Sequence, residues 1–299
     1  MDLDSFLVSL YVLVDDRWQH DHGGRTPRRT GRPVRLSDPE VLTLAILSQW
    51  PRFRSERDFW RFADAHLRGY FPDLCSQGQL NRRIRALEPQ MRALQQALAG
   101  GLADPSAVYR VLDTTLVAAI VRVRASEAGK GLFCGQATFG RSASKTEWVY
   151  GFKVALVVDP EGVITAFGLA QASSDERPIG DALLAEDRYE AYLADKGFTG
   201  VEWERRWLEE YGSLVAATPK NGSRRAWPKK DRRWAAGKRQ IIEGVICQLK
   251  DFFGLERHRA KTLGGLLTRL AAKVAAYTCA QRINGSLGRP ARHLADLLV

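Results

Sequence analysis

Three acidic residues stand out because of where they lie in the chain. Asp113 follows "SAVYRVL", whose alternating and largely β-branched apolar residues predict a strand that ends in this carboxylate. Asp195 ends a later strand, "EAYLAD", and Glu243 lies within the amphipathic helix predicted for residues 239–257. Carboxylates at strand ends and on a neighbouring helix can hold hard cations, which is chemistry used in phosphoryl transfer.

The elements around these carboxylates predict a mixed sheet. After the strand before Asp113 come two strands, "WVYGFKVALVVD" and "GVITAFGLAQA", joined by the turn sequence "DPEG". The remaining order is helix, strand, helix, strand, helix, which predicts an α/β fold with a five-stranded mixed sheet flanked by helices. The fourth strand can lie parallel beside the first, so we expect Asp113 and Asp195 to meet at one edge.

Glu243 shares one side of its predicted helix with two basic residues. At about 100° per residue, Arg239, Glu243 and Lys250 fall within about 40° of one another, along the border of the apolar face. If that face packs on the sheet, the border points at the edge that carries the two aspartates. Arg239 and Glu243 are also spaced as an ordinary i,i+4 ion pair, and this simpler interpretation stays open.

A cluster of three carboxylates needs neutralisation by protons or cations. Bringing three negative charges together costs several kcal/mol through their mutual repulsion, and a bound divalent metal ion can offset that cost. No His and no C-x-x-C pair lies at ligand spacing nearby, so the oxygen ligands predict Mg²⁺ or Mn²⁺ rather than zinc. Two such ions about 4 Å apart can activate a water or a 3′-hydroxyl and stabilise the leaving oxygen.

The charge of the chain favours a polyanionic partner. Its 45 Lys and Arg residues exceed its 34 Asp and Glu residues, which gives a formal net charge of +11. The longest apolar stretch, residues 263–281, is interrupted by Arg269 and Lys273, and the first residues lack the positive charge of a secretory signal. These features predict a cytoplasmic protein that binds nucleic acid and does not span or bind a membrane.

The chain divides into two predicted domains. Residues 1–104 carry apolar residues at helical spacing and predict an all-α domain for DNA binding or dimerisation. Within it, the basic residues 21–38 are rich in Gly and Pro and predict a linker. Residues 105–299 carry the strands, the three carboxylates and a C-terminal helix, and predict the catalytic domain.

A short insertion at residues 219–238 is dense in Lys and Arg and contains two tryptophans. Such cations bind phosphates, and aromatic side chains among them stack on unpaired or flipped bases. A tryptophan that only anchors the loop fits the same pattern. With basic residues beside Asp195 and on the late helix, the candidate DNA-binding residues are Lys196, Arg224, Arg225, Trp227, Lys229, Lys230, Trp234, Arg239 and Lys250.

Together these motifs resemble those of bacterial insertion-sequence transposases of the DDE class. Such proteins carry D-[ST] after a first strand, D-[KR]-G-[YF] after a later strand, and a helix with Y-x2-R-x3-E-x6-K. The corresponding residues here are Asp113, Thr114, Asp195, Lys196, Gly197, Phe198, Arg239, Glu243 and Lys250, with Ala236 at the tyrosine position. "WVYGFKVALVVDPEGVITAFGLAQASSDERP" resembles the segment between the two Asp motifs, which typically carries Y-G-x-K, here Tyr150 to Lys153. "RLSDPEVLTLAIL" and "QLKDFFGLERHRAKTLGG" resemble one family in particular, insertion-sequence family 982.

The resemblance implies an RNase H-like catalytic domain, in which Asp113, Asp195 and Glu243 hold two Mg²⁺ or Mn²⁺ ions. It implies cleavage of double-stranded DNA at terminal inverted repeats and transfer of the 3′-hydroxyl into target DNA. It also implies a bacterial, nucleoid-associated homodimer that holds two element ends. Asp175 is a rival second ligand, although it follows the third strand and not the fourth. Two alternatives stay open: a domesticated DNA-binding protein that no longer cuts, and an RNase H-like nuclease without strand transfer.

Overall fold

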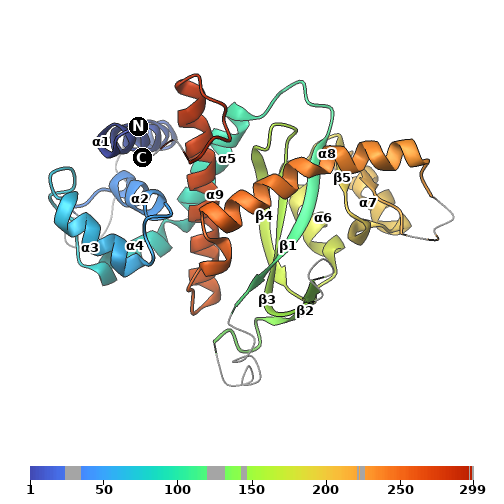
Figure 1. The fold of residues 1–299 in the computed structure, drawn as a ribbon, viewed down its shortest axis with the longest axis horizontal. Coiled ribbons are helices and arrows are strands. Elements are labelled where there is room, and N and C mark those ends of the chain that lie inside the picture. Colours follow the sequence, from blue (N-terminus) through green and yellow to red (C-terminus); the bar gives the residue numbers. More distant parts are fainter. Residues whose placement is uncertain are drawn as a thin grey trace. The chain divides into compact units, whose positions relative to one another are not determined.

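The chain forms two compact units (Figure 1). The computed structural model describes residues 1–23, 35–119, 132–142, 147–220, 222, 226–295 and 297. The helical unit holds Met1–Leu98, Leu249–Ala260 and Gly264–Val299, and the sheet unit holds Ala99–Gln248 and Lys261–Leu263. Two late stretches of the chain thus belong to the helical unit, so the boundary of the units differs from the predicted domain boundary at residue 104. The functional division into a DNA-binding and a catalytic domain stays a prediction.

The helical unit is built from the first helices and the last one. Its helices among the described residues are α1 (Leu3–His22), α2 (Asp38–Leu47), α3 (Glu56–His66), α4 (Gln77–Ala86), most of α5 (Glu88–Leu102) and nearly all of α9 (Leu263–Ser286). A capping box begins α2: the Ser37 hydroxyl accepts a bond from the Glu40 N–H at 3.3 Å, and the Glu40 carboxylate accepts one from the Ser37 N–H. All residues of α9 from 270 to 281 are buried, so α9 is a core helix.

The sheet has the predicted mixed character. Its strands are β1 (Arg110–Ala118), β2 (Thr138–Ser142), β3 (Glu147–Val158), β4 (Ile164–Gln171), β5 (Ala191–Ala194) and β6 (Leu214–Ala217). Among the described residues there are six strands in the order β2-β3-β1-β5-β6, with β4 also paired to β3. The predicted count of five was wrong because β2, "TFGRS", offers only one bulky apolar residue. It forms a strand by pairing with the first part of β3.

The pairing of β1 explains the position of Asp113. As predicted, β1 runs parallel to β5, with Leu112 opposite Ala194. The strand does not end at Asp113, contrary to the prediction, because β1 continues to Ala118 by antiparallel pairing with β3. Asp113 therefore lies where the β1–β5 pairing ends, and Asp195 directly follows β5.

Different helices cover the two faces of the sheet. On one face, α6 (Glu176–Asp187) and α7 (Val201–Tyr211) pack over a core that includes Leu112, Val157 and Trp207. Across the other face lies α8 (Lys229–Cys247), which contacts β1, β3 and β5 (Figure 1). The helix α8 buries Ala235, Ile242 and Val245, and this anchors the segment that carries Arg239 and Glu243.

The late helix differs from the prediction at both ends. It begins at Lys229 and not at Arg239, so the predicted insertion at residues 219–238 supplies the first half of α8. Lys, Arg and Ala are good helix formers, and Pro228 stands directly before the first turn, which explains the early start. At the other end α8 passes into a π-helical turn, Gln248–Phe252, and Gly254 at φ 61° stops the chain from continuing to Arg257 as one helix.

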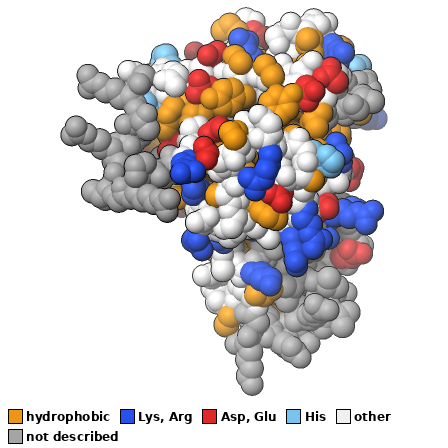
Figure 2. Space-filling model, turned by 90° about the vertical axis from the view of Figure 1, so that its left-hand side faces the viewer, with side chains coloured by type: hydrophobic (Ala, Val, Ile, Leu, Met, Phe, Trp, Pro, Cys, Tyr) orange, Lys and Arg blue, Asp and Glu red, His pale blue; other side chains and the backbone are white. Residues whose placement is uncertain are grey.

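Basic side chains gather on part of the described surface. On the face drawn in Figure 2, most Lys and Arg side chains lie across the middle and lower part, with Asp and Glu side chains among them, and hydrophobic side chains are more frequent above. None of the helices in the described parts of the chain has the length and apolar character needed to cross a membrane. The clustering of basic side chains agrees with the expected polyanionic partner.

Candidate active site

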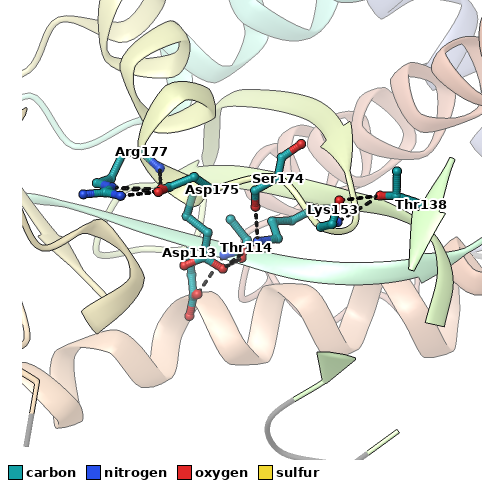
Figure 3. A network of polar contacts seen from close by, with 9 residues as sticks. Asp113, Thr114, Thr138, Lys153, Ser174, Asp175 and Arg177 are labelled. Atoms are coloured by element: carbon teal, nitrogen blue, oxygen red, sulfur yellow. Dashed lines mark hydrogen bonds and ion pairs between the residues drawn. The ribbon is translucent and has the colours of Figure 1, made fainter. Parts of the chain in front are cut away.

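Asp113 and Thr114 are neighbours in β1 but face opposite sides of the sheet, because side chains alternate along a strand. Asp113 faces α8, where its Oδ2 accepts a hydrogen bond from Arg239 at 3.0 Å. Thr114 faces α6, where its hydroxyl donates to Glu176 at 2.8 Å. The Thr114 N–H also donates to Asp113 Oδ1 at 2.7 Å (Figure 3). The two residues of the D-[ST] motif therefore connect helices on both faces.

One guanidinium joins Asp113 to Asp195. The Nη2 atom of Arg239 lies 3.0 Å from Asp113 Oδ2, and its Nη1 atom lies 3.1 Å from Asp195 Oδ1. The side chains of Arg239 and Asp113 are 14% and 17% exposed, and that of Asp195 is 36% exposed. Two carboxylates from different strands thus share a single positive charge where the β1–β5 pairing ends.

Burial makes the Asp113 carboxylate hard to ionise. Loss of solvation raises the pKa of Asp113 to about 6; Asp195 adds to this rise, whereas Arg239 and the Thr114 N–H oppose it. With both carboxylates ionised, one guanidinium leaves an uncompensated negative charge. The pair therefore favours a further or stronger cation.

Glu243 lies on α8 one turn beyond Arg239, and it is exposed. Within the described ranges, no three His, Cys, Asp or Glu side chains lie close enough together to hold a metal ion. The structure thus brings Asp113 and Asp195 together and does not group Glu243 with them. An exposed glutamate can change its rotamer at small cost, so its position on α8 still permits a role as the third ligand.

A further carboxylate, which the sequence did not predict, lies on the α6 side of this site. Glu176 accepts the hydrogen bond from the Thr114 hydroxyl and pairs with Lys153 Nζ at 3.2 Å. Lys153 also donates to the Ser174 carbonyl at 2.9 Å (Figure 3). Glu176 stands in the polar run "SSDERP", which offers no local signal, whereas its partner is the lysine of the Y-G-x-K motif.

Two glycines explain how closely these segments approach one another. A Cβ atom on Gly151 would lie 2.1 Å from the Val117 carbonyl oxygen, where β3 passes β1. A Cβ atom on Gly197 would lie 1.6 Å from a carboxylate oxygen of Glu176. These are the glycines of the Y-G-x-K and D-K-G-F motifs. The backbone contact requires glycine at position 151, whereas a side chain at position 197 would displace the Glu176 carboxylate.

Asp175, the rival second ligand, is engaged by its own helix. It caps α6 by accepting a bond from the Arg177 N–H at 2.9 Å, and its carboxylate pairs with the Arg177 guanidinium (Figure 3). These hydrogen bonds lower the pKa of Asp175 to about 2. Asp175 therefore acts as a cap, and Asp195 is the aspartate that lies beside Asp113.

A comparison with known protein families identifies the family of this chain. Residues 122–279, more than half of the chain, match the family described as transposase DDE domain. The chain belongs to this family. The match confirms the predicted DDE class and the RNase H-like α/β fold, and it includes Asp195, Arg239 and Glu243. A comparison with curated proteins found no match.

The transposase family implies DNA as the partner of this chain. The matched residues begin after Asp113, so the role of this aspartate rests on its geometry beside Asp195. The assignment to insertion-sequence family 982 stays a prediction.

The first turns of α8 give this transposase a basic surface. Lys229, Lys230, Arg233 and Trp234 line a surface cavity of about 450 Å³. The Trp234 side chain is 52% exposed, and its ring meets that of Tyr109 edge-on with the centroids 6.0 Å apart. The structure thus brings together three predicted DNA-binding residues and adds Arg233, which was not predicted.

The other predicted DNA contacts are placed elsewhere in the transposase. Trp227 lines a second cavity, of about 460 Å³, beside β6. Lys196 is exposed, and Lys250 pairs with Glu256 at 2.7 Å. Two predicted contacts lie outside the described residues: Arg224 and Arg225.

DDE transposases use divalent metal ions, and the residues of this site fit such ions in part. Carboxylate oxygens are the ligands that Mg²⁺ and Mn²⁺ prefer. Asp113 and Asp195 already converge on one cation, the guanidinium of Arg239. Glu243, the third residue of the predicted set, stays a predicted ligand.

Proposed function

We propose that this transposase cleaves double-stranded DNA at the ends of an insertion sequence and joins the resulting 3′-hydroxyl to target DNA. Asp113, Asp195 and Glu243 are the proposed ligands of two Mg²⁺ or Mn²⁺ ions. When bound, such ions activate a water or a 3′-hydroxyl and stabilise the leaving oxygen of an in-line phosphoryl transfer. The observation that carries the proposal is the single guanidinium shared by Asp113 and Asp195.

The two aspartates suit this role because the fold holds them in place before any substrate arrives. Asp113 lies within β1, directly after its pairing with β5 and opposite Leu156 of β3, and the Thr114 N–H donates to one of its oxygens. Asp195 follows β5 directly, so the parallel pairing of β5 with β1 sets its distance from Asp113. Preorganised carboxylates need no rearrangement when charge develops at the phosphate.

Arg239 has two roles in this proposal. Before ions bind, it neutralises the aspartate pair. With ions bound to the aspartates, the Arg239 guanidinium would be released from both carboxylates and would bind a phosphate near the scissile bond. Lys250 stays a proposed phosphate contact.

The helix α8 also suits a DNA strand that runs along it. From Lys230 to Arg239 the axis advances about 13 Å, at 1.5 Å per residue. This length corresponds to about four base pairs of DNA at 3.4 Å each. A duplex whose phosphates contact Lys229, Lys230 and Arg233 therefore reaches the aspartate pair with its next few nucleotides.

The test uses the full-length protein, Mn²⁺, a target plasmid and a labelled duplex that carries the inverted repeat flanking the gene. Glu243→Gln should abolish cleavage and leave the Kd for the duplex within several-fold, since glutamine keeps the size of the side chain and loses its charge. Glu209→Gln on α7 is the matched control, because Glu209 is 68% exposed, and it should cleave like the wild type. Undiminished cleavage by Glu243→Gln refutes the proposed site.

The products of the same assay distinguish the alternatives. Labelled ends joined to the plasmid support strand transfer. Nicking without joining identifies a nuclease, and binding without nicking identifies a DNA-binding protein that does not cut. A homodimer is proposed because two element ends must be held together, and sedimentation of the complex with paired ends should show two copies of the chain.

A further inference from the structure

We propose that Glu176 is a positioning residue that sets the placement of Asp113 and Asp195 relative to each other. The inference rests on the proposed function, in which these aspartates hold metal ions. Glu176 contacts the neighbours of both aspartates: Thr114 on one side and Gly197 on the other. It acts through these neighbours and does not itself take part in the chemistry.

On the Asp113 side, the contact is a hydrogen bond. The Thr114 hydroxyl donates to Glu176 Oε1 at 2.8 Å, and the Thr114 N–H donates to Asp113 Oδ1 at 2.7 Å. Because Thr114 and Asp113 face opposite sides of the sheet, a bond that fixes one side chain also limits rotation of the strand about its axis. Glu176 therefore helps to orient the Asp113 carboxylate from the opposite face.

On the Asp195 side, Glu176 makes a packing contact with Gly197. The backbone of Gly197 packs against the Glu176 carboxylate so closely that a Cβ atom there would lie 1.6 Å from Oε2. The next residue, Phe198, is fully buried and packs on Gly180 of α6, where a Cβ atom would lie 2.9 Å from its ring. The turn that begins at Asp195 thus packs on α6, with the Glu176 carboxylate against Gly197, two residues after the aspartate.

The negative charge of Glu176 is neutralised by Lys153, so Glu176 differs from the proposed metal ligands, which share one guanidinium. Lys153 Nζ lies 3.2 Å from Glu176 Oε1, and the Lys153 and Glu176 side chains are 12% and 23% exposed. The Ser174 carbonyl, at 2.9 Å, holds the same ammonium group in place. Glu176 is also the first residue of α6, where the N-terminal end of the helix stabilises a negative charge.

The aspartate pair is therefore held from both faces of the sheet. Arg239 joins the two carboxylates directly on the α8 side, and Glu176 contacts the Thr114 hydroxyl and Gly197 on the α6 side. Residues that orient metal ligands in this way typically change metal affinity by about 10- to 100-fold when they are removed. The same loss is expected here.

The experiment is a double-mutant cycle read out by Mn²⁺ binding to the full-length protein without DNA. Glu176→Ala and Gly197→Ala should each raise the Kd for Mn²⁺ by about tenfold or more. Gly197 does not have a positive φ, so alanine there disturbs the turn only by displacing Glu176. In the double variant the new methyl group has room, and the Kd should be no higher than in Glu176→Ala alone.

Two further readouts distinguish positioning from mere stability. Cleavage by Glu176→Ala should show a lower kcat with the KM for DNA within about threefold, because the DNA-binding surface is unchanged. Glu176→Gln keeps the length and the acceptor for Thr114, so its Kd for Mn²⁺ should rise by less than about threefold. If Glu176→Ala fails to fold, the contrast between Gly197→Ala and Glu176→Gln carries the test.

Controls separate this inference from the proposed function. Asp113→Asn should abolish high-affinity Mn²⁺ binding, and wild-type affinity in that variant refutes the proposed site itself. Glu209→Gln should bind Mn²⁺ like the wild type. If Asp113→Asn loses Mn²⁺ while folded Glu176→Ala or Gly197→Ala binds it normally, or if the two substitutions are additive, the positioning role of Glu176 is overturned alone.

Discussion

Replacing Arg239 with alanine should destabilise the metal-free protein and make its stability depend on divalent ions. The substitution removes two ion-paired hydrogen bonds, at 3.0 and 3.1 Å, and leaves Asp113 and Asp195 facing each other without a counter-charge. Charge-assisted bonds of this kind contribute about 1.5–3 kcal/mol each, and the bond to the more exposed Asp195 lies toward the lower end.

The loss is limited by protonation of Asp113. Its pKa of about 6 is already raised by burial, and without Arg239 it rises further, so at pH 7.5 taking up a proton costs at most about 2 kcal/mol. We therefore expect the free energy of unfolding to fall by about 2–4 kcal/mol at pH 7.5. At pH 5 Asp113 is mostly protonated in both proteins, so the missing counter-charge of Arg239 matters less. The difference in unfolding free energy between the variant and the wild type should therefore shrink to about 1 kcal/mol at pH 5.

The assay is urea unfolding of the full-length wild type and Arg239→Ala, at both pH values, with and without Mn²⁺. Arg206→Ala is the matched control, because Arg206 also joins two carboxylates, Asp181 at 3.2 Å and Glu210 at 3.3 Å, but is 47% exposed. Its loss should stay below about 1 kcal/mol. Mn²⁺ should raise the stability of Arg239→Ala by more than it raises that of Arg206→Ala, which should respond like the wild type, because only Arg239 competes with the ion for the two aspartates. Equal losses in the two variants, or no response to Mn²⁺, would refute the reasoning.

Three further predictions concern metal and DNA binding. Since burial raises the pKa of Asp113 to about 6, Mn²⁺ binding should release roughly three-quarters of a proton at pH 5.5 and almost none at pH 7.5. Calorimetry in two buffers of different ionisation enthalpy measures this release. Equal release at both pH values would contradict the role of Asp113 as a metal ligand. Lys230→Ala should reduce the slope of log affinity against log salt by about one for any duplex, whereas Trp234→Ala should weaken binding by about 1–3 kcal/mol only for DNA with unpaired bases. Equal weakening of intact duplex by Trp234→Ala would identify this side chain as an anchor and not a base-stacking residue.

Much of the architecture could be predicted from local patterns. Alternation in β1, and the apolar runs of β3 and β4 with a turn sequence between them, predicted strands. A half-buried strand alternates apolar and polar residues, whereas a strand buried on both faces is a short continuous apolar run. The parallel placement of β5 beside β1 then followed from the order of elements, and with it the meeting of Asp113 and Asp195. Elements without a clear pattern were harder: β2 gains its strand conformation from β3, and the charged start of α8 was mistaken for a loop.

The sequence by itself determined the class of fold, the transposase motifs and the aspartate pair, because each depends on residue types at fixed spacings along the chain. Only the tertiary structure decided that Arg239 joins the two aspartates and that Glu176 supports them from the opposite face. These contacts depend on how closely separate backbone segments approach, as at Gly151 and Gly197, and no local pattern records that distance. A side chain such as Glu176 obtains its role from its neighbours in space, and those neighbours come from β1, β3 and the turn after β5.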